Sequence, residues 1–166
     1  MNNVKIKKDE YLEFVSGNKE MLYRIAFGYL HDSVTSLDAV DEAIYLGFIH
    51  LKSLKEKKYL KTWLVRILIN ECLKILRRKK REIVFDVIPE EGEDFEDDSI
   101  HLKIAIDRLD EDLKKVIVLR YFGGFTISQT AQILDIPPGT VSTRTKRALD
   151  ELKVELSLEE GVSYDE

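Results

Sequence analysis

One stretch near the carboxyl end, residues 126–152, constrains the fold of this chain more than any other. It reads TISQTAQILDIPPGTVSTRTKRALDEL and places two short helical patterns around a tight turn. The first pattern opens on a capping-box-like pair three residues apart, Thr126 and Gln129. Its apolar residues recur at i, i+4 and i+7, so they share one helix face: Ile127, Ala131 and Leu134. This arrangement predicts the first half of a helix-turn-helix.

The turn is predicted between Asp135 and Pro138. Ile136 supplies an apolar plug, and two consecutive prolines cannot continue a helix interior. Asp135 stands where many helix-turn-helix sequences place glycine, but aspartate tolerates left-handed geometry better than most residues. A second helix should start near Pro138. Its buried stripe is expected to hold Val141, Ala148, Leu149 and Leu152.

The outward face of this second helix carries hydroxyls and cations, which suit phosphates and base edges in a DNA major groove. They are Ser142, Thr143, Lys146 and Arg147. An ordinary helical hairpin would also expose polar residues, since any amphipathic helix turns them toward water. The small Ala131 at the helix crossing and the basic outward face favour a DNA-binding unit instead.

Charge divides the chain into two modules. Residues 1–82 hold 17 basic and 11 acidic side chains, whereas residues 83–99 hold eight acidic and no basic ones. The acidic segment also contains Pro89 and Gly92 without a helical period, so it is predicted to be an extended linker. The net charge of −5 does not exclude nucleic-acid binding, because local fields act within about 10 Å. A sharper hypothesis is that the linker acids occupy a basic surface of a partner, imitating nucleic acid.

The amino-terminal module shows three helical patterns, so the prediction is an all-α protein of two small helical domains. The first pattern occupies residues 21–30 and breaks at 31–33. In the second, Ser36 is the expected cap and Leu37 is expected to face inward. Acids crowd the first turns of this helix, where the helix dipole explains them as well as binding does. They are Asp38, Asp41 and Glu42.

The third pattern, residues 59–81, is better suited to nucleic acid. It reads YLKTWLVRILINECLKILRRKKR and ends in five consecutive cations. Cations also favour a helix C-terminus, and Trp63 also suits a core. Arg66 and Asn70 nevertheless lie one helical turn apart beside the basic tail. Such a surface suits one strand of opened DNA, where a stacked base adds roughly 1–3 kcal/mol.

Other chemistry is not supported by the sequence. Cys72 is the one cysteine, expected to be buried, and the three histidines are scattered, so neither disulfides nor a zinc site can be assembled. No nucleophile–base set or phosphate-binding glycine loop is present, so no catalytic residue, metal or cofactor is expected. Without a long apolar run or a signal-peptide pattern, the chain should be cytoplasmic and should not insert into membranes.

The order of these parts resembles the extracytoplasmic-function (ECF) group of bacterial sigma factors, small members of the sigma-70 family that retain regions 2 and 4. The matching pieces are LYRIAFGYL (22–30), DAVDEA (38–43), TWLVRILIN (62–70), LRRKKR (76–81) and the stretch 118–148. The resemblance implies region 2 at 1–82, an acidic linker at 83–99, region 4 at 100–158 and a flexible tail at 159–166.

The resemblance also implies partners. The acidic helix with Asp38, Asp41 and Glu42 is similar to the part of region 2 that docks on the clamp helices of the largest polymerase subunit. The residues expected at the minus-10 element of promoter DNA are Lys61, Trp63, Arg66, Asn70, Arg77 and Arg78. Those expected at the minus-35 element are Arg120, Ser142, Thr143, Lys146 and Arg147. Region 4 would also meet the flap of the second subunit, and a cognate anti-sigma factor, often membrane-bound, would hold the chain inactive.

Two departures from the family pattern bear on these expectations. Gly47 and Phe48 stand where many relatives have a basic residue and larger apolar ones, and Ser142 stands where some have a basic residue.

Three functions are weighed: a sigma factor that needs core polymerase and serves stress or envelope genes, a free-standing DNA-binding regulator, and an interaction module that only titrates regulators.

Overall fold

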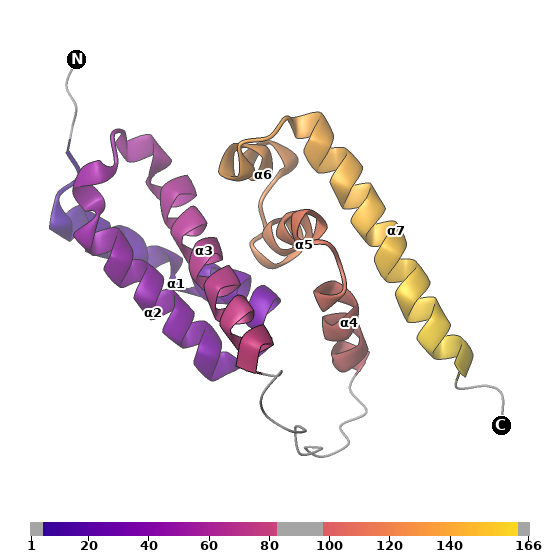
Figure 1. Cartoon of the computed structure of the whole chain (residues 1–166). Helices are drawn as coiled ribbons and strands as arrows, with labels where there is room; N and C mark the ends of the chain where they lie inside the picture. Colours follow the sequence, from indigo (N-terminus) through magenta and orange to yellow (C-terminus); the bar gives the residue numbers. More distant parts are fainter. Residues whose placement is uncertain (1–4, 83–97, 163–166) are drawn as a thin grey trace.

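The computed structural model describes residues 5–82 and 98–162, with side chains at 5–82 and 99–158. These residues form helices and no β-strand (Figure 1), so the all-α prediction is confirmed. The elements are α1 (Lys8–Leu30), α2 (Ser33–Ile49), η1 (Leu51–Ser53), η2 (Lys57–Tyr59), α3 (Leu60–Glu82), α4 (Asp98–Asp107), α5 (Glu111–Ile117), η3 (Val118–Phe122), α6 (Ile127–Leu134) and α7 (Pro138–Val162).

Three boundaries differ from the predicted ones. Helix α1 begins at Lys8, well before the pattern predicted at residues 21–30. Helix α4 begins at Asp98, inside the predicted linker, and α7 continues to Val162, beyond the expected end at residue 158. Residues 83–97, which carry most of the predicted acidic linker, lie outside the described residues, as do 163–166. The hypothesis that the linker acids imitate nucleic acid therefore concerns acids that lie almost entirely outside the described residues.

Helices α1, α2 and α3 form the first domain. The predicted break after residue 30 is confirmed, because His31 adopts a left-handed conformation with φ 55°. Asp32 then caps α2 by accepting a hydrogen bond from the backbone N–H of Thr35 at 2.7 Å. The prediction that Ser36 is the cap is wrong, since Ser36 lies one turn into the helix and is fully buried.

Small residues line the inner face of α2 and allow close helix packing. Ala39, Ala43 and Gly47 are buried there. A Cβ added at Gly47 would lie 2.4 Å from the Tyr11 hydroxyl oxygen, so α1 could not approach α2 as closely with any larger residue. Larger apolar residues are left outside: Leu37 is 52% exposed, and the prediction that it faces inward is wrong.

Helices α4 to α7 form the second domain around two apolar clusters. One joins α5, α6 and α7 through Val116, Ala131 and Val141. The other packs α4 and α5 against α7, and its members on α7 are Ala148 and Leu152. Leu149, which was predicted to be buried, is 41% exposed, and Ile127, which shares a helix face with the buried Ala131, is 36% exposed. Ile127 is the first residue of α6, and Leu149 flanks the stripe that Ala148 and Leu152 already fill.

The two domains pack against each other, with η3 against α1 and α6 against α3; Figure 1 shows α6 beside α3. One continuous apolar cluster contains core residues of the first domain together with four from the second: Val118, Leu119, Phe125 and Ile133. Gly28 of α1 permits this approach, because a Cβ there would lie 2.9 Å from the Phe122 ring. The sequence contains no signal for this contact.

Cys72, a residue of α3, is buried in the core, as predicted. Burial raises the pKa of its thiol to about 12, which keeps it protonated near neutral pH. Among the described residues, no group of three or more His, Cys, Asp or Glu side chains is placed to hold a metal ion. No helix in the described ranges is long and apolar enough to cross a membrane.

Candidate nucleic-acid interface

Helices α6 and α7 form the predicted helix-turn-helix, and local sequence explains each boundary. Thr126 and Gln129 make a reciprocal capping box, with hydrogen bonds of 3.1 and 3.0 Å that satisfy two backbone donors. Asp135 ends α6 in the left-handed conformation with φ 54°. Pro138 is the first residue of α7, where its missing N–H costs nothing. The turn between two helices is therefore encoded locally.

The crossing of the two helices depends on small and branched residues. Ala131 is 6% exposed and meets Val141, which is fully buried. Ile136 is partly buried against the same cluster and acts as the predicted plug. This packing fixes the rotation of α7 about its axis and so decides which side chains face outward.

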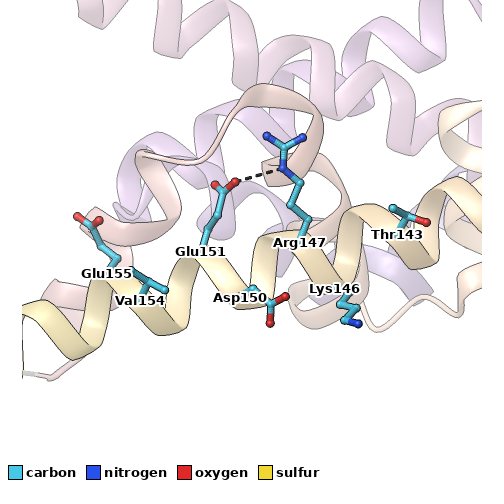
Figure 2. A pocket seen from close by; sticks show the side chains of 7 residues that line it. All are labelled: Thr143, Lys146, Arg147, Asp150, Glu151, Val154 and Glu155. Atoms are coloured by element: carbon cyan, nitrogen blue, oxygen red, sulfur yellow. Dashed lines mark hydrogen bonds and ion pairs between the residues drawn. The ribbon is translucent and has the colours of Figure 1, made fainter.

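The predicted reading face of α7 is exposed. Ser142, Thr143, Lys146 and Arg147 all face solvent. Figure 2 shows Thr143, Lys146 and Arg147 on the first turns of α7, with Arg147 directed toward Glu151. The Arg147 Nε donates to Glu151 Oε1 at 3.3 Å, an exposed pair that is worth little and that a phosphate or base could displace.

Charge changes sign along the exposed side of α7. Lys146 and Arg147 are followed by Asp150, Glu151 and Glu155, which line the same groove (Figure 2). Carboxylates repel phosphates, so DNA contact would be confined to the N-terminal half of the helix. Recognition helices of this motif present the same half to base edges.

Arg120 is held differently from the other predicted minus-35 residues. It lies on η3, is partly buried, and donates from Nη1 to the Phe125 carbonyl at 3.3 Å. This bond ties η3 to the start of the helix-turn-helix. Arg120 therefore supports the turn that leads into α6.

Helix α3 presents the predicted single-strand surface. Lys61, Arg66 and Asn70 are exposed, and Trp63 is half-buried with its ring against the core of the first domain. The helix ends in the exposed run that contains Arg77 and Arg78. The structure thus brings the six predicted minus-10 residues onto one helix, spread over several turns.

Arg66 is exposed, yet its guanidinium group reaches the second domain. Its Nε donates to the Ile133 carbonyl at 2.6 Å and its Nη2 to the Gln132 carbonyl at 2.8 Å. These carbonyls belong to the last turn of α6, where backbone acceptors have no partner within their own helix. Sequence reasoning placed Arg66 toward DNA and could not foresee this contact, which joins residues 66 positions apart.

Helix α2 carries a mixed acidic and apolar surface. Asp38, Asp41 and Glu42 are exposed, as the sequence suggested. Val34 and Tyr45, respectively 67% and 58% exposed, lie on the same helix with Leu37. Residues spaced three, four or seven positions apart lie on the same side of a helix. Val34, Asp38, Asp41 and Tyr45 therefore form one stripe along α2, and Leu37 lies beside it. An apolar stripe beside acids is typical of a protein-binding surface, and sequence reasoning missed its apolar half because it assigned Leu37 to the core.

Both domains match known families at the positions that the geometry delimits. Residues 14–82 match the model described as "Sigma-70 region 2", and residues 105–154 match "Sigma-70, region 4". The ECF RNA polymerase sigma-E factor of Escherichia coli K12 is 31% identical over 67% of this chain and 68% of its own length. The chain belongs to the ECF sigma factors. This sigma factor is thus a transcription initiation factor. The family membership supports the first of the three functions weighed, a sigma factor, over a free-standing regulator.

Relatives of this sigma factor match most of its length. The sigma factor SigV of Bacillus subtilis 168 is 28% identical over 88% of this chain and 90% of its own. Among solved structures, CnrH in complex with the cytosolic domain of CnrY has a TM-score of 0.71 at 19% identity, covering 92% of this chain and 90% of that one. The sigma factor RpoE of Bartonella quintana, in complex with the anti-sigma factor NepR, has a TM-score of 0.64 at 24% identity, with coverage of 87% and 97%. At these identities the likeness concerns the fold.

Proposed function

We propose that this sigma factor divides promoter recognition between α7 and α3, with α2 as its main attachment to core RNA polymerase. The observation that carries the proposal is the surface of α3, which carries Trp63, Arg66 and Asn70 and ends in a run of exposed cations. Aromatic stacking and phosphate neutralisation are what an opened strand requires. The paired carboxylates or nucleophiles of a catalyst are not needed for this task.

Helix α7 reads the minus-35 element as intact duplex. Thr143, Lys146 and Arg147 contact base edges or phosphates in the major groove, Ser142 contacts the backbone at the helix start, and Arg120 contacts a flanking phosphate. The outward direction of these α7 side chains supports this role. The acidic second half of α7 sets the limit of the DNA contact.

Helix α3 captures the minus-10 element after it opens. A base that leaves the stack lies against Trp63 and pairs its edge with Asn70, while Lys61, Arg66, Arg77 and Arg78 neutralise the non-template strand. Binding the open form alone shifts the duplex toward melting by mass action. The polymerase carries out nucleotide transfer, so binding energy is the whole contribution of the sigma factor.

The surface of α2 binds the clamp helices of the largest polymerase subunit, and the second domain meets the flap of the second subunit. The acids Asp38, Asp41 and Glu42 pair with basic side chains of the clamp, while Leu37 and Tyr45 bury apolar area. Their exposure on one helix supports this role. An apolar centre with a charged rim is the usual anatomy of such an interface.

An anti-sigma factor holds this protein inactive in the cytoplasm, and a membrane anchor on that partner would link release to an envelope signal. Support comes from the similar structure of the sigma factor RpoE, which is in complex with the anti-sigma factor NepR. Genes for stress or envelope responses would then be the targets.

Initiation on a promoter by core polymerase, with and without the sigma factor, tests the whole proposal. Trp63→Ala and Asn70→Ala should reduce strand opening, followed by permanganate reactivity of unpaired thymines, while leaving duplex binding largely intact. Arg147→Ala should weaken minus-35 binding by roughly 1–3 kcal/mol if the contact is bidentate. Lys19→Ala on α1 and Lys153→Ala on α7 remove exposed cations outside the proposed surfaces and serve as controls. Failure of the wild-type chain to join core polymerase and direct initiation would refute the function.

A further inference from the structure

The outward face of α7 divides into a basic half and an acidic half. Lys146 and Arg147 belong to the first, Asp150 and Glu151 belong to the second, and all four are exposed along one groove (Figure 2). Figure 1 shows α7 along the outer side of the second domain, so this face is open to a partner. Reading DNA requires only the basic half. The proposed function therefore leaves the acidic half without a ligand of its own.

Two large apolar side chains lie on the same face, beyond the first acids. Val154 is 61% exposed and Leu158 is 65% exposed. They are four residues apart, which makes them neighbours on one side of the helix, and they line a hollow together. Neither belongs to the apolar clusters of the described residues. An apolar pair beside charged side chains suits a protein partner, whereas the carboxylates repel the phosphates of a nucleic acid.

The order of side chains along α7 is complementary to itself when one helix is reversed. Two copies of α7 placed antiparallel about a two-fold axis at residue 149 bring each position level with the one equally far beyond the axis. Arg147 and Glu151 both lie two residues from residue 149, so each arginine is level with a glutamate of the other copy. Lys146 then lies within one helical turn of Asp150 of the other copy. A parallel pair would instead place like charges level with each other.

The apolar residues meet smaller ones in the same register. Leu158 and Thr140 each lie nine residues from residue 149. Val154 and Thr143 lie five and six residues from it, on opposite sides. The members of these pairs are 18 and 11 residues apart, which is close to five and three full turns, so each pair lies on one side of the helix. Threonine methyl groups of one copy thus face the valine and leucine of the other.

We propose that two copies of this sigma factor associate through α7 in an antiparallel contact between identical surfaces. Such a two-fold contact is the commonest kind in soluble oligomers, and the axis makes every pair occur twice. A second copy is the partner because its charges run in the order that this face requires and its small residues meet the exposed apolar ones. An unrelated partner would not require this reversed order of cations and acids along one helix.

The association is expected to be weak and reversible. Arg147 already pairs with Glu151 of its own helix at 3.3 Å, so the dimer exchanges one exposed ion pair for another and gains little from charge alone. Burial of Val154 and Leu158 supplies most of the affinity, whereas charge selects the antiparallel register. One helix face covers less area than a stable dimer needs, so we expect a dissociation constant on the order of 100 µM.

The contact would cover the residues that read duplex DNA. Thr143, Lys146 and Arg147 lie inside it, so α7 cannot hold a second copy and the minus-35 element at once. This consequence rests on the proposed function of α7, whereas the association itself does not. At a total concentration about ten times the dissociation constant, about one fifth of the chains are monomeric, so duplex binding should be about fivefold weaker.

Sedimentation equilibrium of the full chain measures the association directly. The weight-average mass of wild type should rise with concentration from 19.3 kDa toward twice that value. Val154→Glu should weaken the association at least about tenfold, because it places a charge in the apolar part of the contact. Leu12→Glu is the matched control, since Leu12 is 51% exposed on α1 and lies outside the contact. A mass that stays at 19.3 kDa up to about five times the expected dissociation constant would overturn the proposal, as would equal association of wild type and Val154→Glu.

Exchange of charge tests the register. Arg147→Glu places acids level with acids, and Glu151→Arg places cations level with cations, so each variant alone should self-associate at least about tenfold less than wild type. In an equimolar mixture of the two variants, every acid at these positions is level with a cation, so association should return to within about threefold of wild type. Single variants that associate like wild type would overturn the antiparallel contact, and so would a mixture that stays monomeric.

Initiation by core polymerase tests the consequence for promoter recognition. Once the polymerase is saturated, wild-type chain added to about ten times the dissociation constant should reduce initiation up to about fivefold, whereas Val154→Glu should not. No reduction by wild type, or an equal reduction by both chains, would refute the covering of α7. If no chain directs initiation at any concentration, the proposed function fails, and the mass measurements still decide whether the copies associate.

Discussion

Val141→Ala should loosen the helix-turn-helix without removing any of its DNA contacts. Val141 is fully buried where α7 crosses α6 and touches the cluster of Val116 and Ala131. It faces inward, opposite to the exposed Thr143 two residues later. The two positions therefore separate the support of the recognition helix from its reading face.

The magnitude follows from the burial of Val141. Removing two methyl-sized groups forfeits about 1.6 kcal/mol of transfer free energy at ~0.8 kcal/mol per group. A residual cavity of about 40–50 Å³ would add about 1 kcal/mol at ~24 cal/mol per Å³ if the site does not collapse. The free energy of opening the helix-turn-helix should thus fall by about 2–3 kcal/mol.

Amide hydrogen exchange read by mass spectrometry is the direct assay, because it reports the stability of this unit apart from the first domain. Peptides covering residues 127–148 should exchange roughly 30- to 150-fold faster in Val141→Ala. Peptides covering α2 should change little. Thr143→Ala is the matched control: it should leave exchange unchanged or slower, since alanine favours helix more than threonine, while weakening duplex binding.

Unchanged exchange of residues 127–148 in Val141→Ala would refute the packing account of this crossing. Loss of protection in Thr143→Ala as large as that in Val141→Ala would refute the separation of the two faces. Either outcome would mean that α7 is rotated about its axis relative to α6.

Three further predictions concern local structure. Thr126→Ala should destabilise α6 by about 1 kcal/mol because the capping box loses an acceptor. Hydrogen exchange of the amides at the start of α6 measures this loss, and Thr143→Ala is the exposed control. Asp135→Gly should leave the free energy of unfolding in urea unchanged or raise it by up to about 1 kcal/mol, since glycine adopts the observed φ of 54° without cost. A clear fall in this free energy would mean that the Asp135 side chain has a structural role. Cys72, whose pKa burial raises to about 12, should react with iodoacetamide at pH 8 far more slowly than the urea-unfolded chain, and comparable rates would show that the first domain opens readily.

Most individual helices could be predicted from the sequence because their signals are local. The capping box at Thr126, the left-handed position at Asp135 and the prolines of the turn each act within a few residues. Periodicity also predicts the buried stripe of α7, except at the exposed Leu149. The same periodicity misled at Leu37. A helix pattern states which side chains are apolar, but it does not state how much of that apolar surface the neighbours will cover.

The order of helices, the residues of the helix-turn-helix and the cationic end of α3 were determined by the sequence itself, since each rests on spacing and residue type. Tertiary structure alone decided that α1 and α3 approach α2 closely at Gly47 and that Leu37 stays outside the core. It also decided that Arg66 reaches the carbonyl groups of α6. These outcomes depend on contacts between residues far apart in the chain, where the partner of each side chain is selected by the packing of whole helices.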